Sequence, residues 1–86
     1  MDNRTIAHRL IEVAHSLEAK HASLYRIQAY RRAAQTVLGL ERPLEEMVAA
    51  DGHKTLKHLP GIGARLSVKI EKLVRTGEIA NLVVSG

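Results

Sequence analysis

The fold is decided by one short stretch, residues 56–67, which reads LKHLPGIGARLS. Regular helix cannot run through it, because Pro60 has no backbone N–H and the glycines at 61 and 63 favour backbone angles that other residues avoid. Ile62 stands between the two glycines. Its side chain can point inward while the glycines let the backbone come close to a ligand. The stretch is therefore predicted to be a tight hairpin that joins two helices.

The same hairpin is predicted to hold phosphate. The backbone N–H groups around Gly61, Gly63, Ala64 and Arg65 would point outward at the start of a helix. First-turn N–H groups have no acceptor within their helix, and the helix start carries a partial positive charge, so such a terminus binds anions. A bare G-x-G could be an ordinary turn between helices. The apolar residues on both sides make this pattern more specific.

Apolar residues recur at helical spacing on both sides of the hairpin. They predict helices over residues 3–20, 24–39, 43–50, 53–58 and 64–75. Asn3 or Thr5 could cap the first of these helices, and Ser23 is a plausible cap for the second. No alternation typical of a strand persists. We therefore expect an all-α fold, a compact bundle of four to five short helices.

Length and composition exclude several classes of protein. The chain has 86 residues and no cysteine, which allows one domain over 1–86 and excludes a thiolate zinc site or a cysteine nucleophile. A large catalytic domain does not fit this length. No run of about 18 apolar residues predicts a membrane span, and the first residues lack the apolar stretch of a signal peptide. We expect a cytoplasmic, monomeric protein, associated with the nucleoid if the source is bacterial.

The positive charge of the chain is concentrated around the hairpin. The net charge is +4, but residues 52–75 carry six Lys and Arg against one Glu, which makes this segment +5. Residues 40–51 carry four acidic residues that offset it. A segregated basic segment favours a polyanionic partner. Charge alone favours a solvated helix face equally, and that alternative stays open here.

Two motifs make most of the chain, roughly residues 6–79, resemble a known family. Residues 25–34 read YRIQAYRRAA, and the LPGIG of residues 59–63 is followed by KI at 69–70 and TGEI at 76–79. The hairpin resembles the helix-hairpin-helix motif, a sequence-nonspecific binder of the DNA backbone. The wider pattern resembles the N-terminal, lyase-type domain of the family X DNA polymerases, which includes DNA polymerase beta and its bacterial relatives. On this resemblance the motif covers about residues 53–76.

The resemblance implies specific roles for basic residues. Arg26 and Arg65 match residues that bind the 5′-phosphate at a gap or nick, Lys57 matches another basic position near that pocket, and Tyr30 matches a tyrosine beside it. The complete set of DNA- or phosphate-binding residues that we predict is Arg26, Tyr30, Arg32, Lys57, Gly61, Gly63, Ala64, Arg65, Lys69 and Lys72. On the residues alone, Tyr30 fits a core position with its hydroxyl at the surface. Tyr25 could stack on an exposed base or sugar, or equally form a hydrophobic staple at its helix start.

The resemblance also implies a catalytic lysine and a cation. Lys69 matches the lysine that forms a Schiff base with the sugar aldehyde of an abasic site, which is followed by β-elimination of the 3′ linkage. The backbone carbonyls of Lys57, Leu59 and Ile62 match those that hold a monovalent cation, Na⁺ or K⁺, at the hairpin. Such a cation would bridge peptide oxygens to a DNA phosphate. No other cofactor is expected.

The chain departs from the family pattern at three positions. Val68 stands where an acidic residue precedes the lysine, and Asn81 stands where a further lysine would lie. These two changes leave lyase activity open. Arg65 replaces a lysine, which keeps the charge and adds a planar fork. The polymerase palm and fingers do not fit within 86 residues, so we expect no nucleotide transfer from this chain.

Three functions follow as expectations. The favoured one is a sequence-nonspecific DNA-binding module of DNA repair that recognises gapped or nicked DNA or a 5′-phosphate. The second is a 5′-deoxyribose phosphate or abasic-site lyase acting through Lys69, and the third is a protein-interaction module that has lost DNA binding. A zinc site at His8, Glu12 and His15 lacks a further ligand, so these histidines are interpreted as surface residues.

Overall fold

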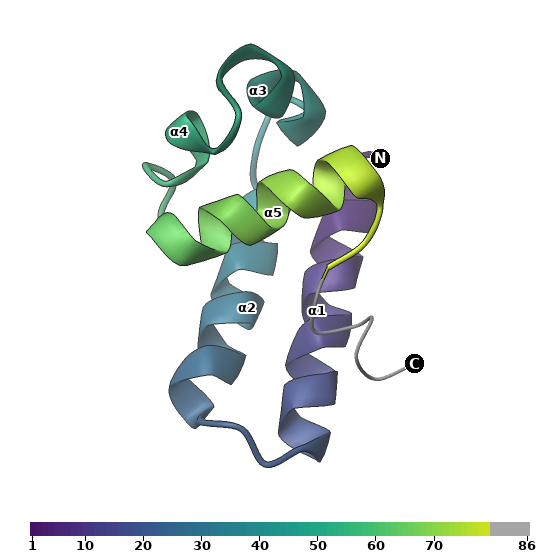
Figure 1. The fold of residues 1–86 in the computed structure, drawn as a ribbon, viewed down its shortest axis with the longest axis vertical. Coiled ribbons are helices and arrows are strands. Elements are labelled where there is room, and N and C mark those ends of the chain that lie inside the picture. The colour runs from purple at the N-terminus through teal and green to yellow at the C-terminus, as the bar shows by residue number, and fades with distance from the viewer. Residues whose placement is uncertain (80–86) are drawn as a thin grey trace.

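The computed structural model describes residues 1–79, which form five helices and no strand (Figure 1). The helices are α1 (Asn3–Ala19), α2 (Leu24–Leu38), α3 (Leu44–Asp51), α4 (His53–Leu56) and α5 (Ala64–Thr76). The predicted all-α fold is confirmed, and each helix lies within two residues of its expected bounds. Asn81 lies outside the described residues.

The longest helices form the base on which the hairpin rests. Helices α1 and α2 run side by side in opposite directions, α5 crosses them, and α3 and α4 lie together at one end (Figure 1). Leu10 of α1, Val37 of α2 and Ile70 of α5 are fully buried in one shared core. Burial of aliphatic side chains of this size contributes about 1.5–3 kcal/mol each. The core therefore fixes α5, the second helix of the hairpin, against the α1–α2 pair.

The sequence predicts caps for the starts of α1 and α2, and only the cap of α2 is confirmed. Ser23 caps α2 as predicted, because its side chain accepts a hydrogen bond from the Arg26 N–H at 3.3 Å. The prediction that Asn3 or Thr5 caps α1 is wrong. The cap is Asp2, whose carboxylate accepts from the Thr5 N–H at 2.8 Å. This hydrogen bond lowers the pKa of the Asp2 carboxyl below its usual value.

Asn3 instead joins α1 to the start of α3. Its Nδ2 donates to the Arg42 carbonyl at 2.9 Å, and its Oδ1 accepts from the Leu44 N–H at 2.7 Å. Helix α3 begins after Pro43, which offers no side-chain cap. The Asn3 amide therefore supplies the missing cap from a distant part of the chain and holds the α3–α4 end against α1.

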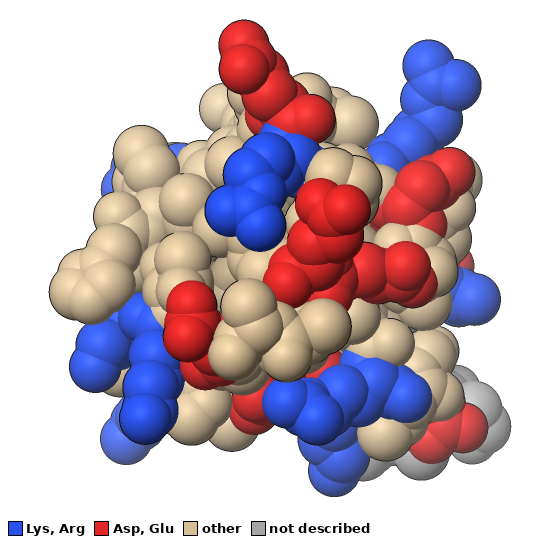
Figure 2. All heavy atoms as spheres, turned by 90° about the horizontal axis from the view of Figure 1, so that it is seen from above, with Lys and Arg blue, Asp and Glu red and all other residues tan. Residues whose placement is uncertain are grey.

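The charged side chains of the α3–α4 end are mixed in sign. Figure 2, which views the molecule from that end, shows acidic side chains gathered over the middle of this face and Lys and Arg side chains mostly nearer its rim. Helix α3 contributes Glu45, Glu46 and Asp51 to this surface, and all three are exposed. In the described part of the chain no helix is long and apolar enough to cross a membrane.

Replacement of Asn3 tests the link between α1 and α3. Asn3→Ala removes both hydrogen bonds, and we expect the free energy of unfolding to fall by about 1–2 kcal/mol, the usual cost of a lost helix cap. Urea titration followed by far-UV circular dichroism measures it. His8→Ala, which changes an exposed side chain of the same helix, is the matched control. Equal midpoints for Asn3→Ala and the parent would show that the link contributes nothing.

Candidate nucleic-acid interface

The segment between α4 and α5 folds as the predicted hairpin. Gly61 has a φ of +76°, in the region that favours glycine. Ile62 follows with only 3% of its surface exposed, so its side chain enters the core as expected. Its N–H donates to the Leu59 carbonyl at 3.1 Å and closes the turn. The turn directs the apolar side chain inward and the glycine backbone outward.

The hairpin is also tied to α2 by a residue that sequence reasoning missed. The Thr36 hydroxyl donates to the Pro60 carbonyl at 2.6 Å. A signal for this contact exists in the sequence, since Tyr25, Ala29, Arg32 and Thr36 recur at the spacing of one helix face. That face of α2 meets the hairpin. Ala29 also lines the interface and was not predicted.

The backbone N–H groups at the start of α5 are open. Gly63 precedes the helix, and its N–H and those of Ala64, Arg65 and Leu66 donate no hydrogen bond to any residue among 1–79. The first internal bond runs from the Ser67 N–H to the Gly63 carbonyl at 2.9 Å. These groups, together with the helix dipole, can bind an anion.

Positions 61 and 63 of the hairpin differ in whether the fold requires glycine. A Cβ at Gly61 would lie 2.7 Å from Cγ and Cδ of Arg32, and its φ is positive, so the fold itself requires glycine there. Gly63 has a φ of −88°, and a Cβ there would meet no atom within 4 Å. Nothing within residues 1–79 explains why position 63 lacks a side chain. A side chain there would extend into open space beside the start of α5.

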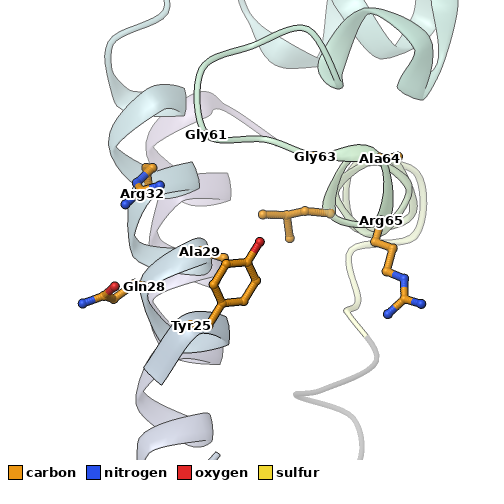
Figure 3. A pocket seen from close by; sticks show the side chains of 9 residues that line it. Tyr25, Gln28, Ala29, Arg32, Gly61, Gly63, Ala64 and Arg65 are labelled. Carbon is orange, nitrogen blue, oxygen red and sulfur yellow. The ribbon is translucent and has the colours of Figure 1, made fainter. Parts of the chain in front are cut away.

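Two adjacent hollows lie along α2, the larger against the hairpin and the smaller against α5. The larger, about 440 Å³, is lined by the hairpin and by α2 residues that include Arg32 (Figure 3). The smaller, about 260 Å³, is lined by Arg26, Tyr30 and Lys69 among others. Both hollows are also bordered by the same four residues, Tyr25, Ala29, Arg65 and Leu66. Figure 3 shows the Tyr25 ring extending from α2 toward α5, and Tyr25 is 83% exposed.

Lys69 and Tyr30 meet in the smaller hollow. Tyr30 is 4% exposed, which confirms its expected core position. Its hydroxyl lies 3.4 Å from Lys69 Nζ and accepts a hydrogen bond, and this nitrogen is 6.0 Å from the centre of the tyrosine ring. Lys69 itself is half-buried. The contact holds the lysine amine beside the hollow that Arg26 and Arg65 also line.

Not every predicted residue joins these hollows. Lys57 follows α4 and Lys72 lies on α5, and both are exposed, but neither lines either hollow. Lys72 shares the helical stripe of Arg65 and Lys69 that the sequence predicts. Within residues 1–79, neither of these lysines forms an ion pair, and the same holds for Arg26, Arg32 and Arg65. These cations are available to a ligand.

An ion-pair cluster braces the far end of α5. His53 Nδ1 lies 3.2 Å from Oε1 of Glu71, and Oε2 of Glu71 lies 3.2 Å from the Arg75 guanidinium. Desolvation raises the pKa of Glu71, but the His53 hydrogen bond and the Arg75 charge outweigh it and hold that pKa below its usual value. The carboxylate stays ionised and links α4 to α5.

The three carbonyls implied in cation binding fit in donor chemistry. The Leu59 carbonyl accepts the turn hydrogen bond of Ile62 and keeps a second lone pair. The carbonyls of Lys57 and Ile62 accept no hydrogen bond from the described residues. Carbonyl oxygens are the hard ligands that such cations prefer. Among the side chains of residues 1–79, no group of three or more His, Cys, Asp or Glu could hold a metal ion.

A model of the helix-hairpin-helix domain family matches residues 1–79. The chain therefore belongs to the helix-hairpin-helix domains. Domains of this family generally bind DNA, so membership indicates nucleic-acid binding. No curated protein matches the chain significantly in sequence.

Substitution of the two glycines separates fold from interface. Gly61→Ala forces a side chain into a left-handed backbone and against Arg32, and we expect the free energy of unfolding to fall by about 1–2 kcal/mol. Gly63→Ala meets no atom and reduces the freedom of the unfolded chain, so we expect stability to be unchanged or raised by up to about 1 kcal/mol. Thermal unfolding of both variants and of the parent measures these changes in stability. An equal loss of stability would contradict the assignment of Gly63 to the interface.

Proposed function

We propose that this chain is a sequence-nonspecific DNA-binding module that recognises the 5′-phosphate at a gap or nick, with a role in DNA repair. One observation carries the proposal. Open N–H groups and cations without acidic partners meet in both hollows: Gly63, Ala64 and Arg32 line the larger, Arg26 lines the smaller, and Arg65 and Leu66 line both. A phosphate is the anion that satisfies open N–H groups and arginine forks together.

The shape of the site favours the DNA backbone over base edges. The interface consists of a hairpin and the sides of two hollows lined by arginines, which suit phosphates of the backbone. Tyr25 is the exposed aromatic of the site, so it is the residue positioned to stack on an unpaired base or a sugar. A gap offers both a terminal phosphate and an unpaired base, which supports the preference proposed.

A monovalent cation would complete the hairpin. We place Na⁺ or K⁺ at the carbonyls of Lys57, Leu59 and Ile62, where its charge would offset that of a nearby phosphate. The exposed amine of Lys57 would also bind phosphate directly. Lys72, which is exposed as well, would contact the backbone of the duplex beyond the two hollows. We further propose that the chain acts as a monomer in the cytoplasm.

Binding to defined DNA ends tests this function. Fluorescence anisotropy would compare an intact duplex, a nicked duplex and a gapped duplex with a 5′-phosphate, and we expect the tightest binding to the last. Affinity should fall with salt, with a slope of about −0.9 in log–log form for each phosphate contacted. Gly63→Ala, which should keep its stability, should weaken binding about ten-fold, because its methyl group would occupy the open space through which a phosphate approaches the start of α5.

The matched control for the charged residues is Arg31. Arg65→Ala and Arg31→Ala remove the same charge, but Arg31 is paired with Glu18 at 2.6 Å and lies outside both hollows. Only Arg65→Ala should lose affinity strongly. If Arg65→Glu left affinity unchanged, or if the salt slope were near zero, the chain would instead be a protein-interaction module of the same fold.

A second candidate function is supported by the contact between Lys69 and Tyr30. The amine lies at the edge of the smaller hollow, so a 5′-phosphate held there by Arg26 and Arg65 would bring the aldehyde of its abasic sugar to Lys69. There Lys69 would attack C1′ and release water to form a Schiff base. Loss of a C2′ proton would then expel the 3′ phosphate by β-elimination. Val68, beside the lysine, is exposed and offers no acid or base for the proton transfer.

Borohydride trapping on an incised abasic duplex tests the lyase. Reduction converts the Schiff base to a stable covalent adduct, so a lyase gives a protein–DNA band on a denaturing gel. We expect Lys69→Arg to keep DNA affinity, since the charge remains, and to lose the band. Lys54→Ala keeps every group named in the reaction and is the control. A band that survives Lys69→Arg would exclude Lys69 as the nucleophile, and no band from the parent protein would exclude the lyase.

A further inference from the structure

The side chain of Arg32 passes directly over the hairpin backbone. A Cβ at Gly61 would lie 2.7 Å from both Cγ and Cδ of Arg32, so the aliphatic stem of the arginine occupies the space beside the Gly61 α-carbon. Figure 3 shows Arg32 on α2 close to Gly61. Packing of the stem restricts the rotamers of a normally mobile side chain. The stem therefore lies beside Gly61, and Arg32 lines the larger hollow while it remains exposed.

The charge of Arg32 is uncompensated, unlike that of its neighbour. Arg31 forms an ion pair with Glu18 of α1 at 2.6 Å. Arg32 forms neither an ion pair nor a side-chain hydrogen bond with any of residues 1–79. Two consecutive arginines on α2 thus differ in role. Arg31 joins helices α1 and α2, and Arg32 presents a positioned cation to the hollow beside the hairpin.

The two hollows have separate sets of cations. Arg32 lines the larger hollow and not the smaller, whereas Arg26 and Lys69 line the smaller and not the larger. The border between them is formed by Tyr25 and Arg65, which line both. One anion in each hollow would therefore meet a different arginine of α2 and share Arg65. Adjacent hollows of like charge suit neighbouring phosphates of one polynucleotide strand.

We propose that Arg32 binds an internal phosphodiester of the strand whose 5′-terminal phosphate occupies the smaller hollow. This rests on the proposed function, because it assumes that DNA binds at the hairpin. The guanidinium fork matches two phosphate oxygens, and its stem is already ordered against Gly61, so little side-chain freedom is lost on binding. The site then recognises two consecutive features of a strand end, a terminal phosphate and the linkage that follows it.

The test combines a protein variant with a change in a single DNA linkage. Gapped duplexes with a 5′-phosphate would carry one neutral methylphosphonate at the first, second or third linkage of the downstream strand. Parent protein, Arg32→Ala and Arg31→Ala would be titrated with each duplex by fluorescence anisotropy. A methylphosphonate removes the phosphate charge but leaves the strand in place, so it reports one contact at a time.

We expect one of these three linkages to be coupled to Arg32. Its replacement should weaken binding of the parent and of Arg31→Ala about ten-fold, and that of Arg32→Ala less than two-fold. Arg32→Ala should also reduce the log–log salt slope by about 0.9, the value for one phosphate contact, and Arg31→Ala should not. Arg32→Lys keeps the charge without the fork and should restore part of the affinity.

The outcomes distinguish this inference from the function on which it rests. Failure of the parent protein to bind gapped DNA would overturn both. In another outcome, the parent protein binds gapped DNA while Arg32→Ala binds every duplex, modified or unmodified, more weakly than the parent by the same factor. In that case Arg32 is coupled to no particular phosphate and the inference is wrong. Circular dichroism of Arg32→Ala shows whether its fold is intact, and the Arg32→Lys arm keeps the test valid if it is not.

Discussion

The interface depends on the docking of the hairpin turn against α2. Three features hold the hairpin turn against α2. They are the left-handed backbone at Gly61, the Arg32 stem beside that glycine, and the hydrogen bond from Thr36 to the Pro60 carbonyl. With the turn held there, Ile62 enters the core and the N–H groups that follow face outward. The same side of α2 forms the other wall of both hollows. The packing of the hairpin against α2 therefore determines both the position of Ile62 in the core and the arrangement of the candidate binding surface.

Local sequence signals were sufficient for the helices and the turn. Apolar spacing, Ser23 as a cap and the proline–glycine hairpin each act over a few residues, so they can be read without a structure. The inward position of Ile62 was also predictable, because its apolar side chain is stabilised by leaving water and the glycines on either side allow the chain to turn it inward.

Contacts between distant segments were beyond such signals. Asparagine is a common N-cap residue, so Asn3 was expected to cap its own helix, yet its side chain caps α3. Its amide lies beside Leu44 only in the folded chain, so local sequence does not reveal this contact. Spacing alone could not distinguish Lys69, which meets Tyr30, from Lys72, which shares the stripe but lines neither hollow. The division of the basic residues between two hollows likewise depends on how α2 and α5 cross. Each of these features requires the tertiary arrangement.

If Gly63 binds phosphate as proposed, selection for stability and selection for binding act in opposite directions at this position. Its backbone angles and its open surroundings would tolerate an alanine, so retaining glycine there keeps extra freedom in the unfolded chain. Variants selected for thermal resistance alone would be expected to acquire a side chain at this position. On the same proposal, a homologue with a non-glycine residue aligned with Gly63 is expected to bind nucleic acid more weakly.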